Sequence, residues 1–152
     1  MASSNEELAN VLNDLIEINN DRIEGYEKAI KETDDPDLKA LFIDMASRSH
    51  QLKNELSSEL RRLGDKPTDG TRTLGKVFRL WMDMKAALTG RDHEAILGSC
   101  ERGEDAALDA YEDAINSDAA LPANIRQMIE RQKQRLLQDH NRIKALRDSV
   151  HV

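Results

Sequence analysis

The feature that most constrains this chain is a helical spacing of apolar residues that breaks at each of its three prolines, at positions 36, 67 and 122. Between these breaks, apolar residues recur every three or four positions, which places them on one face of an α-helix. In the first segment the face consists of Leu8, Leu12, Leu15, Ile16, Ile23, Tyr26 and Ile30. The pattern therefore predicts long amphipathic helices that bury one face.

Turn-forming residues mark where these helices end. Asp35 is a favoured N-cap residue, Pro36 suits a first helical position, and Gly64 suits a helix C-terminus. The pattern predicts helices at about 4–33, 36–63, 73–89, 92–116 and 122–149. Short turns join the first two and the last two helices, while the stretch between them is long enough for a crossover. We therefore expect an all-α, antiparallel four-helix bundle with a short extra helix in the crossover between 36–63 and 92–116, as one domain over residues 1–152.

Composition excludes several other classes. The chain is 39% hydrophobic with only seven glycines, which is too apolar for disorder and too poor in turn residues for an all-β domain. No apolar run reaches about 18 residues, so no transmembrane segment is expected. The first ten residues do not resemble a signal peptide, and the single cysteine, Cys100, cannot form an internal disulfide, so we expect a cytoplasmic protein. The net charge of -7 argues against nucleic-acid binding.

An internal repeat relates the two halves of the chain. The segment YEKAI at 26–30 is echoed by YEDAI at 111–115. Each is followed by a polar turn with a proline and then by a predicted helix that carries one histidine, His50 or His140. Two related helical hairpins joined by a crossover are the plan expected of ferritin-like bundles.

Polar residues interrupt the apolar faces near the middle of each helix. Asn19 and Glu104 fill gaps seven residues before the repeated tyrosines, and His140 lies between apolar residues of the last helix. On the second helix Ser49 falls on the apolar face with His50 beside it. A buried carboxylate needs a partner, so Glu104 is expected to have one.

Three segments carry a resemblance to known proteins: LNDLIEINNDRIEGYEKAI at 12–30, LWMDMKAALTGRDHEAIL at 80–97 and CERGEDAALDAYEDAI at 100–115. Through them the chain resembles the ferritin-like superfamily. It is most similar to a family of bacterial four-helix-bundle proteins of unknown function that are associated with stress responses. The resemblance covers nearly the whole chain, and it implies a fold more than a chemistry.

Di-iron members of that superfamily use carboxylates from two helices and a Glu-x-x-His pair from each of the other two. In this chain Ser47 and Leu137 stand three residues before His50 and His140, where the glutamates would be. Asn19 takes the ligand position of the first helix, with Glu24 as a less well-placed substitute. The resemblance therefore implies a degenerate di-iron site, and we expect no cofactor.

Two alternatives stay open. One is a metal-binding oxidase or storage protein with a mononuclear or atypical site for Fe, Zn or Mn. Its candidate ligands are Glu104, His140, His50, Asn19, Glu101 and Glu24. Against this stands a metal-free interior in which Glu104 and His140 pair, or in which the histidines lie at the bundle edge in water.

The predicted crossover helix is apolar around most of its circumference, so it must be covered on more than one side. We expect a homodimer interface there, formed by Val77, Phe78, Trp81, Met84 and Leu88. The second alternative is an adaptor that binds a partner protein through the Trp81 helix. The leading prediction from the sequence is a non-enzymatic, stress-associated homodimer.

Overall fold

The computed structural model describes residues 4–67, 93–117 and 119–150. These residues form four α-helices: α1 (Ser4–Glu32), α2 (Pro36–Arg62), α4 (His93–Ile115) and α5 (Ala123–Val150). The described part of the chain contains no strand, so the all-α prediction is confirmed. The predicted helix at 73–89 and the five interface candidates on it lie outside the described residues.

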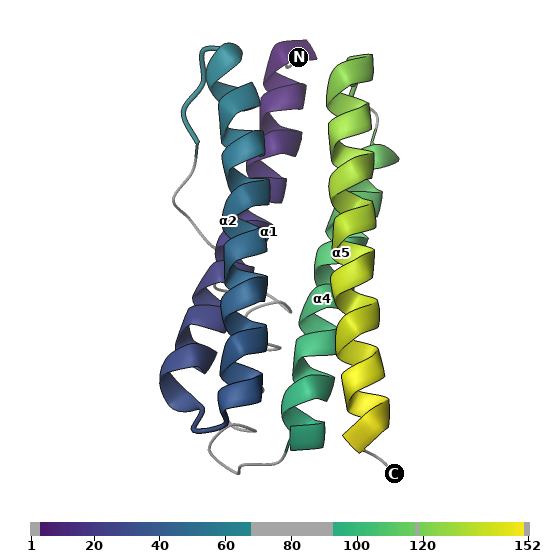
Figure 1. The fold of residues 1–152 in the computed structure, drawn as a ribbon. Coiled ribbons are helices and arrows are strands. Elements are labelled where there is room, and N and C mark those ends of the chain that lie inside the picture. Colours follow the sequence, from purple (N-terminus) through teal and green to yellow (C-terminus); the bar gives the residue numbers. More distant parts are fainter. Residues whose placement is uncertain (1–3, 68–92, 118, 151–152) are drawn as a thin grey trace.

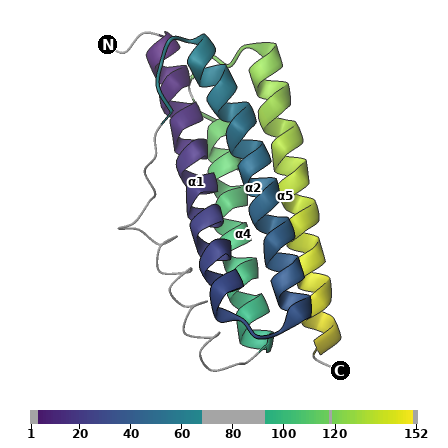
Figure 2. The same cartoon turned by 60° about the vertical axis from the view of Figure 1, so that its left-hand side comes forward.

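The helices pack side by side as a bundle (Figures 1 and 2). In Figure 1, α1 runs downward from the N-terminus, α2 returns upward, α4 also runs upward and α5 descends to the C-terminus. Hydrogen bonds between α1 and α4 fit these directions. Asn19 donates to Tyr111, and Arg22 donates to Glu104. The later residue of α1 thus pairs with the earlier residue of α4, as expected for helices that run in opposite directions. Residues from the middle of each of the four helices can therefore lie at the same position along the bundle axis.

The start of α2 follows from its sequence. The Asp35 side chain accepts hydrogen bonds from the backbone N–H groups of Asp37 and Leu38 at 2.8 and 3.1 Å. Pro36 occupies the first turn, where its missing N–H leaves no hydrogen bond unmade. These two residues satisfy the N-terminus of α2 and set the tight turn from α1.

The end of α2 depends on Gly64. The Gly64 N–H donates to the Arg61 carbonyl at 2.9 Å, and the Asp65 N–H donates to the Leu60 carbonyl at 3.2 Å. This pairing is a Schellman motif, which needs a left-handed backbone just beyond the helix. Gly64 supplies it with a φ of 80°. The predicted C-terminal role of this glycine is therefore observed.

The core consists of two apolar clusters at different heights in the bundle. The first lies toward the start of α1 and the end of α2, and it includes Leu12, Leu15, Leu56, Tyr111, Ile129 and Leu136. The second lies toward the α1–α2 turn, and it includes Tyr26, Phe42, Met45, Ile96, Leu97 and Ile143. On every helix, buried polar residues fall between the two clusters. Asn19, Ser49 and Glu104, which interrupt the apolar faces in the sequence, thus meet at one level.

No helix within the described ranges is long and apolar enough to cross a membrane.

Replacing Asp35 by alanine removes the acceptor for two N–H groups of α2. We expect Asp35→Ala to lower the free energy of unfolding by about 1 kcal/mol, measured by urea denaturation. Asp35→Asn is the matched control, since asparagine caps helices about as well and should leave stability nearly unchanged. Equal losses in both variants would contradict a capping role.

Candidate functional site

The site is a layer of polar side chains that crosses the bundle between the two apolar clusters. We call Asn19, Arg22, Arg48, Ser49, Glu104 and Asp139 the polar layer. Arg22 is 1% exposed, and Glu104 and Asp139 are fully buried. Charged groups removed from water this completely persist only when they are paired and hydrogen-bonded. The partners of these charged groups therefore determine whether the layer can bind a metal ion or take part in chemistry.

Arg22 of α1 is the centre of the layer. Its Nε and Nη2 atoms donate to Glu104 Oε1 of α4 at 3.2 and 2.8 Å, and Nη2 also donates to Asp139 Oδ2 of α5 at 3.4 Å. Arg48 of α2 donates to the other oxygen of Asp139. The Tyr26 hydroxyl donates to Glu104 Oε1 at 2.6 Å. Two guanidinium groups thus balance two carboxylates, with each helix supplying one charge.

A second, uncharged chain of hydrogen bonds lies next to these ions. Asn19 Nδ2 donates to the Leu15 carbonyl and to the Tyr111 hydroxyl, both at 2.9 Å. The Tyr111 hydroxyl donates to Gln132 Oε1 at 2.6 Å, and Gln132 Nε2 donates to the Leu52 carbonyl at 3.2 Å. This chain also passes through all four helices, so the register of each helix is fixed twice.

The sequence repeat appears here as a reciprocal pairing. Glu104 on α4 accepts from Tyr26 on α1, and Asn19 on α1 donates to Tyr111 on α4. In the register that matches Tyr26 with Tyr111 and Asn19 with Glu104, Arg22 corresponds to Ala107. The two halves therefore share the tyrosine and the position of its polar partner, but only α1 carries the central charge.

The neighbours of Arg22 keep it charged. Burial alone would lower the pKa of its guanidinium, but the charge of Glu104, followed by Tyr26 and Asp139, outweighs burial and raises that pKa above its ordinary value. The centre of the bundle therefore holds a permanent cation.

Burial also suppresses ionisation of the nearby hydroxyl and thiol groups. It raises the pKa of Tyr26 well above the ordinary value, and the charge of Glu104 raises it further. Burial raises the pKa of Tyr111 as well, against the hydrogen bond from Asn19. The pKa of Cys100 is raised by burial and then by Glu104, so its thiol is held in the unreactive protonated form. None of these three groups is prepared for nucleophilic or proton-transfer chemistry at neutral pH.

The predicted ligands lie in different places. Asn19 and Glu104 are buried, as the gaps in the apolar faces predicted. His50 is half exposed, with Nε2 at 3.3 Å from Glu27 Oε1, and Glu24 is half exposed and paired with Lys28 at 3.1 Å. The structure therefore leaves His50 and Glu24 outside the polar layer.

His140 requires a correction, because the buried residue of that turn is Asp139. The His140 side chain is 15% exposed and lies at the edge of the bundle against α4. Asp139 and His140 both fit a helical spacing between Leu136 and Ile143, so the sequence could not separate them. The Glu104–His140 pair is not formed, since Glu104 binds Arg22 and Tyr26 instead.

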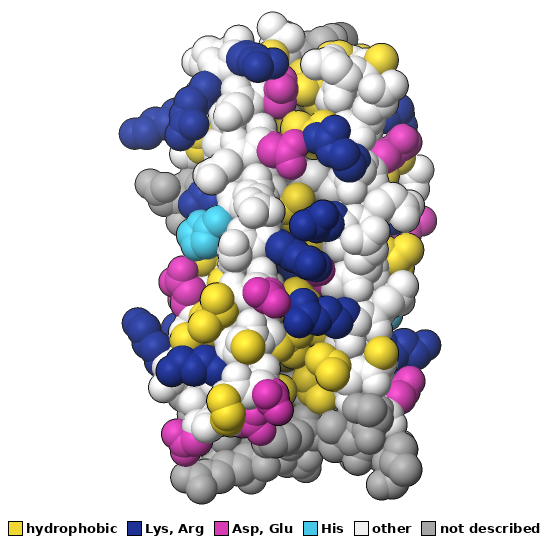
Figure 3. Space-filling model, in the orientation of Figure 1, with side chains coloured by type: hydrophobic (Ala, Val, Ile, Leu, Met, Phe, Trp, Pro, Cys, Tyr) yellow, Lys and Arg dark blue, Asp and Glu magenta, His cyan; other side chains and the backbone are white. Residues whose placement is uncertain are grey.

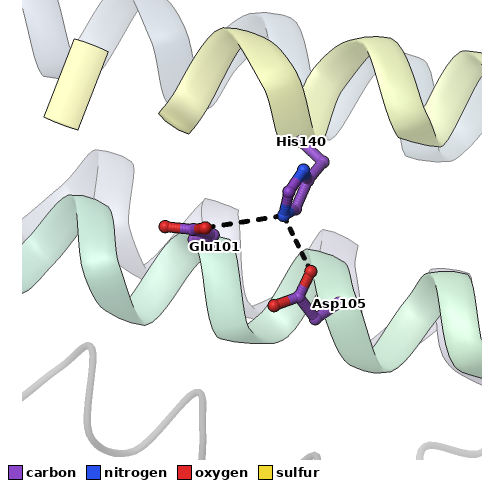
Figure 4. Close-up of side chains that lie close together, drawn as sticks. All are labelled: Glu101, Asp105 and His140. Atoms are coloured by element: carbon purple, nitrogen blue, oxygen red, sulfur yellow. Dashed lines mark ion pairs between the residues drawn. The ribbon is translucent and has the colours of Figure 1, made fainter. Parts of the chain in front are cut away.

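His140 instead forms a cluster with Glu101 and Asp105 of α4 (Figure 4). Its Nε2 atom lies 2.7 Å from Asp105 Oδ1 and 3.6 Å from Glu101 Oε1. Arg147 binds the second carboxylate oxygen of Glu101, and Asn141 Oδ1 lies 3.4 Å from His140 Nδ1. Within the described ranges, this is the one group of three His, Cys, Asp or Glu side chains close enough to share a metal ion.

The polar layer does not fit a di-iron centre. A di-iron site needs several carboxylates and histidines around two cations. Here a guanidinium binds both Glu104 and Asp139, and no histidine of the described residues joins them in a group that could hold a metal ion. A metal ion at this point would face the charge of Arg22.

Sequence reasoning missed Arg22, Arg48 and Asp139. A signal for Arg22 was present, because it stands three residues after Asn19 and four before Tyr26, on the same buried face. Arginine is so common at helix surfaces that its position on this face carried no weight without the partners that α4 and α5 bring to it.

These observations define a helical-bundle protein whose interior is crossed by a buried, charge-balanced network. The chain belongs to the family described as Domain of unknown function (DUF2383), whose profile matches residues 7–117. The match includes Arg22, Arg48 and Glu104 and ends before Asp139 and His140. Among curated proteins, none matches the chain significantly.

Removing the central cation should be severe. We expect Arg22→Met to lower the free energy of unfolding by about 3–5 kcal/mol, because it leaves Glu104 buried without a positive partner. Adding Glu104→Gln should recover much of that loss, since the amide oxygen still accepts from Tyr26 without a charge. Arg62→Met, at a residue 73% exposed, is the control and should change stability by less than about 0.5 kcal/mol. Urea denaturation of the three variants measures all these effects, and a loss in Arg22→Met as small as the control would contradict the central role.

The two tyrosines of the chain, Tyr26 and Tyr111, should resist ionisation in the folded protein. Free tyrosine ionises near pH 10. Because both folded pKa values are raised, the folded state binds more protons above about pH 10, and the free energy of unfolding should fall as pH rises from there. The ultraviolet absorbance of tyrosinate should therefore appear only together with alkaline unfolding. Urea-unfolded protein should titrate near pH 10, and the same titration in folded protein would contradict the buried hydrogen bonds.

Proposed function

We propose that this protein is a ferritin-like, antiparallel four-helix bundle without enzymatic activity, in which a buried ion network replaces the metal centre. The observation that carries the proposal is the position of Arg22. Its guanidinium binds Glu104 of α4 and Asp139 of α5 in the middle of the bundle core, which is where a ferritin-like bundle would hold its metal ions. Arg22 and Arg48, whose guanidinium groups can neither change redox state nor bind oxygen, thus provide the positive charge that the two carboxylates need.

The cellular part of the proposal rests on the family resemblance. We propose a cytoplasmic protein of the bacterial stress response that forms a homodimer through its crossover segment. The adaptor alternative uses the same segment, through Trp81, to bind a partner protein. Both depend on residues outside those the structure describes.

A second candidate function is binding of one divalent cation by Glu101, Asp105 and His140. Zinc ligands lie about 2.0–2.2 Å from the metal, so tetrahedral ligands are about 3.4 Å apart. The 3.6 Å between His140 Nε2 and Glu101 already matches this spacing, while the 2.7 Å to Asp105 must widen by less than about 1 Å. Asn141 lies where it can accept from the His140 Nδ1–H, the kind of support that orients metal-binding histidines. Competition comes from Arg147, which holds Glu101.

One experiment separates the two candidates. The protein is loaded anaerobically with Fe(II), or with Mn(II) or Zn(II), desalted and measured by elemental analysis, alongside Glu104→Gln and His140→Ala. The ion-network proposal expects no metal that depends on Glu104. The cation-site candidate expects near-stoichiometric metal that is lost in His140→Ala and retained in Glu104→Gln.

His50→Ala is the matched control, because His50 also pairs with a glutamate across two helices but has no third ligand nearby among the residues that the structure describes. Metal lost equally in His50→Ala and His140→Ala would mean non-specific surface binding and would reject the cation site. Two metal ions per chain that disappear in Glu104→Gln would reject the ion-network proposal.

A further inference from the structure

A polar groove lies between α2 and α5, on the face shown in Figure 3. It has a volume of about 290 Å³ and is lined by three arginines, Arg48, Arg131 and Arg135. Figure 3 shows Lys and Arg side chains gathered in a column along this face. The chain as a whole carries a net charge of -7, so a concentration of arginines in one groove is a local feature with its own electrostatic field.

Most hydrogen-bond donors of these arginines are uncommitted within the described part of the chain. A guanidinium carries five N–H donors. Arg48 uses its Nη1 for Asp139, and Arg131 uses its Nη2 for Glu55 at 2.6 Å. Arg135 makes no ion pair or hydrogen bond with the other residues the structure describes. The groove therefore presents more positive charge and more donors than its own carboxylate, Glu55, can satisfy.

The other lining residues limit what the groove can hold. Leu52 is the single apolar residue among them, and none is aromatic. A nucleobase would lack a stacking surface, and an apolar ligand would lack contact area. Four glutamines complete the lining. Gln132 is buried and already bonded to Tyr111 and Leu52, while the exposed Gln51, Gln134 and Gln138 can offer hydrogen bonds to hydroxyl or oxyanion groups. The volume is at the lower end of the range for small-molecule sites.

We propose that this groove binds a small, polar oxyanion, through a phosphate or carboxylate group held by Arg131 and Arg135. Guanidinium forks match both groups with paired, charge-assisted hydrogen bonds. Arg48 also lines the groove and donates to Asp139, which in turn accepts from Arg22. A bound oxyanion would thus contact the same arginine that closes the buried network, so occupancy should stabilise the folded bundle.

The test is isothermal titration calorimetry of the full chain with inorganic phosphate, glycerol phosphate and citrate as separate probes. Binding should weaken about tenfold or more in Arg131→Gln and in Arg135→Gln, since each removes charge-assisted hydrogen bonds. Arg62→Gln is the matched control, because Arg62 is an exposed arginine outside the groove and should bind like wild type. Thermal unfolding of each variant verifies that both substitutions leave the bundle folded.

Each outcome decides the proposal. Binding that is lost in both groove variants and kept in the control supports it, and preference for glycerol phosphate or for citrate then assigns the phosphate or the carboxylate as the recognised group. Absence of binding by all three probes up to about 10 mM overturns it, since that affinity is too weak for a specific site. Binding that is unchanged in the groove variants, or that is equally weakened in Arg62→Gln, also overturns it because the anion then lies elsewhere.

Discussion

The ion pair between Arg22 and Glu104 is the interaction on which the interior of this bundle depends. It places a full charge from α1 against a full charge from α4 with neither exposed to water. Removing such groups from water costs several kcal/mol per ion, which their attraction only partly offsets. The pair is therefore a weak source of net stability. Its effect is to disfavour other registers of the two helices, because any shift of α1 against α4 would leave a charge buried and unpaired.

The remaining polar contacts extend this constraint to the other two helices. Asp139 brings α5 to Arg22, and Arg48 brings α2 to Asp139. Hydrophobic contact is not directional, so the apolar side chains above and below the layer distinguish less sharply between neighbouring registers than the charged pairs do. The layer selects one register among these. A bundle with an aliphatic core and few aromatic residues has particular need of such a device.

The same network bears on chemistry. Oε1 of Glu104 already accepts hydrogen bonds from Arg22 and Tyr26, so a metal ion bound by this carboxylate would lie next to a guanidinium of the same charge. The surviving candidate for metal binding lies at the edge of α4 and α5, where His140 meets Asp105 near solvent. The arginine groove between α2 and α5 is on the surface too. Both proposed binding sites, for a cation and for an oxyanion, therefore lie between helices near the surface.

The sequence alone determined the helices and the positions of most of their ends. The signals for helix formation and helix ends act over a few residues, so they can be read locally; they are the apolar spacing, Asp35, Pro36 and Gly64. The four long helices accordingly end within one residue of the predicted positions. The gaps at Asn19 and Glu104 were also readable, because a polar residue on an apolar face is visible in one helix.

Only the tertiary structure decided which partner each polar residue has. Helical spacing allows two adjacent residues to fill one gap, so it could not choose Asp139 over His140 for the interior. Helical spacing also did not predict the burial of Arg22, which is tolerable only because Glu104 and Asp139, on helices far along the chain, pair with it. The energy of a buried charge depends on its neighbours in space, and the order of residues along one helix does not contain them.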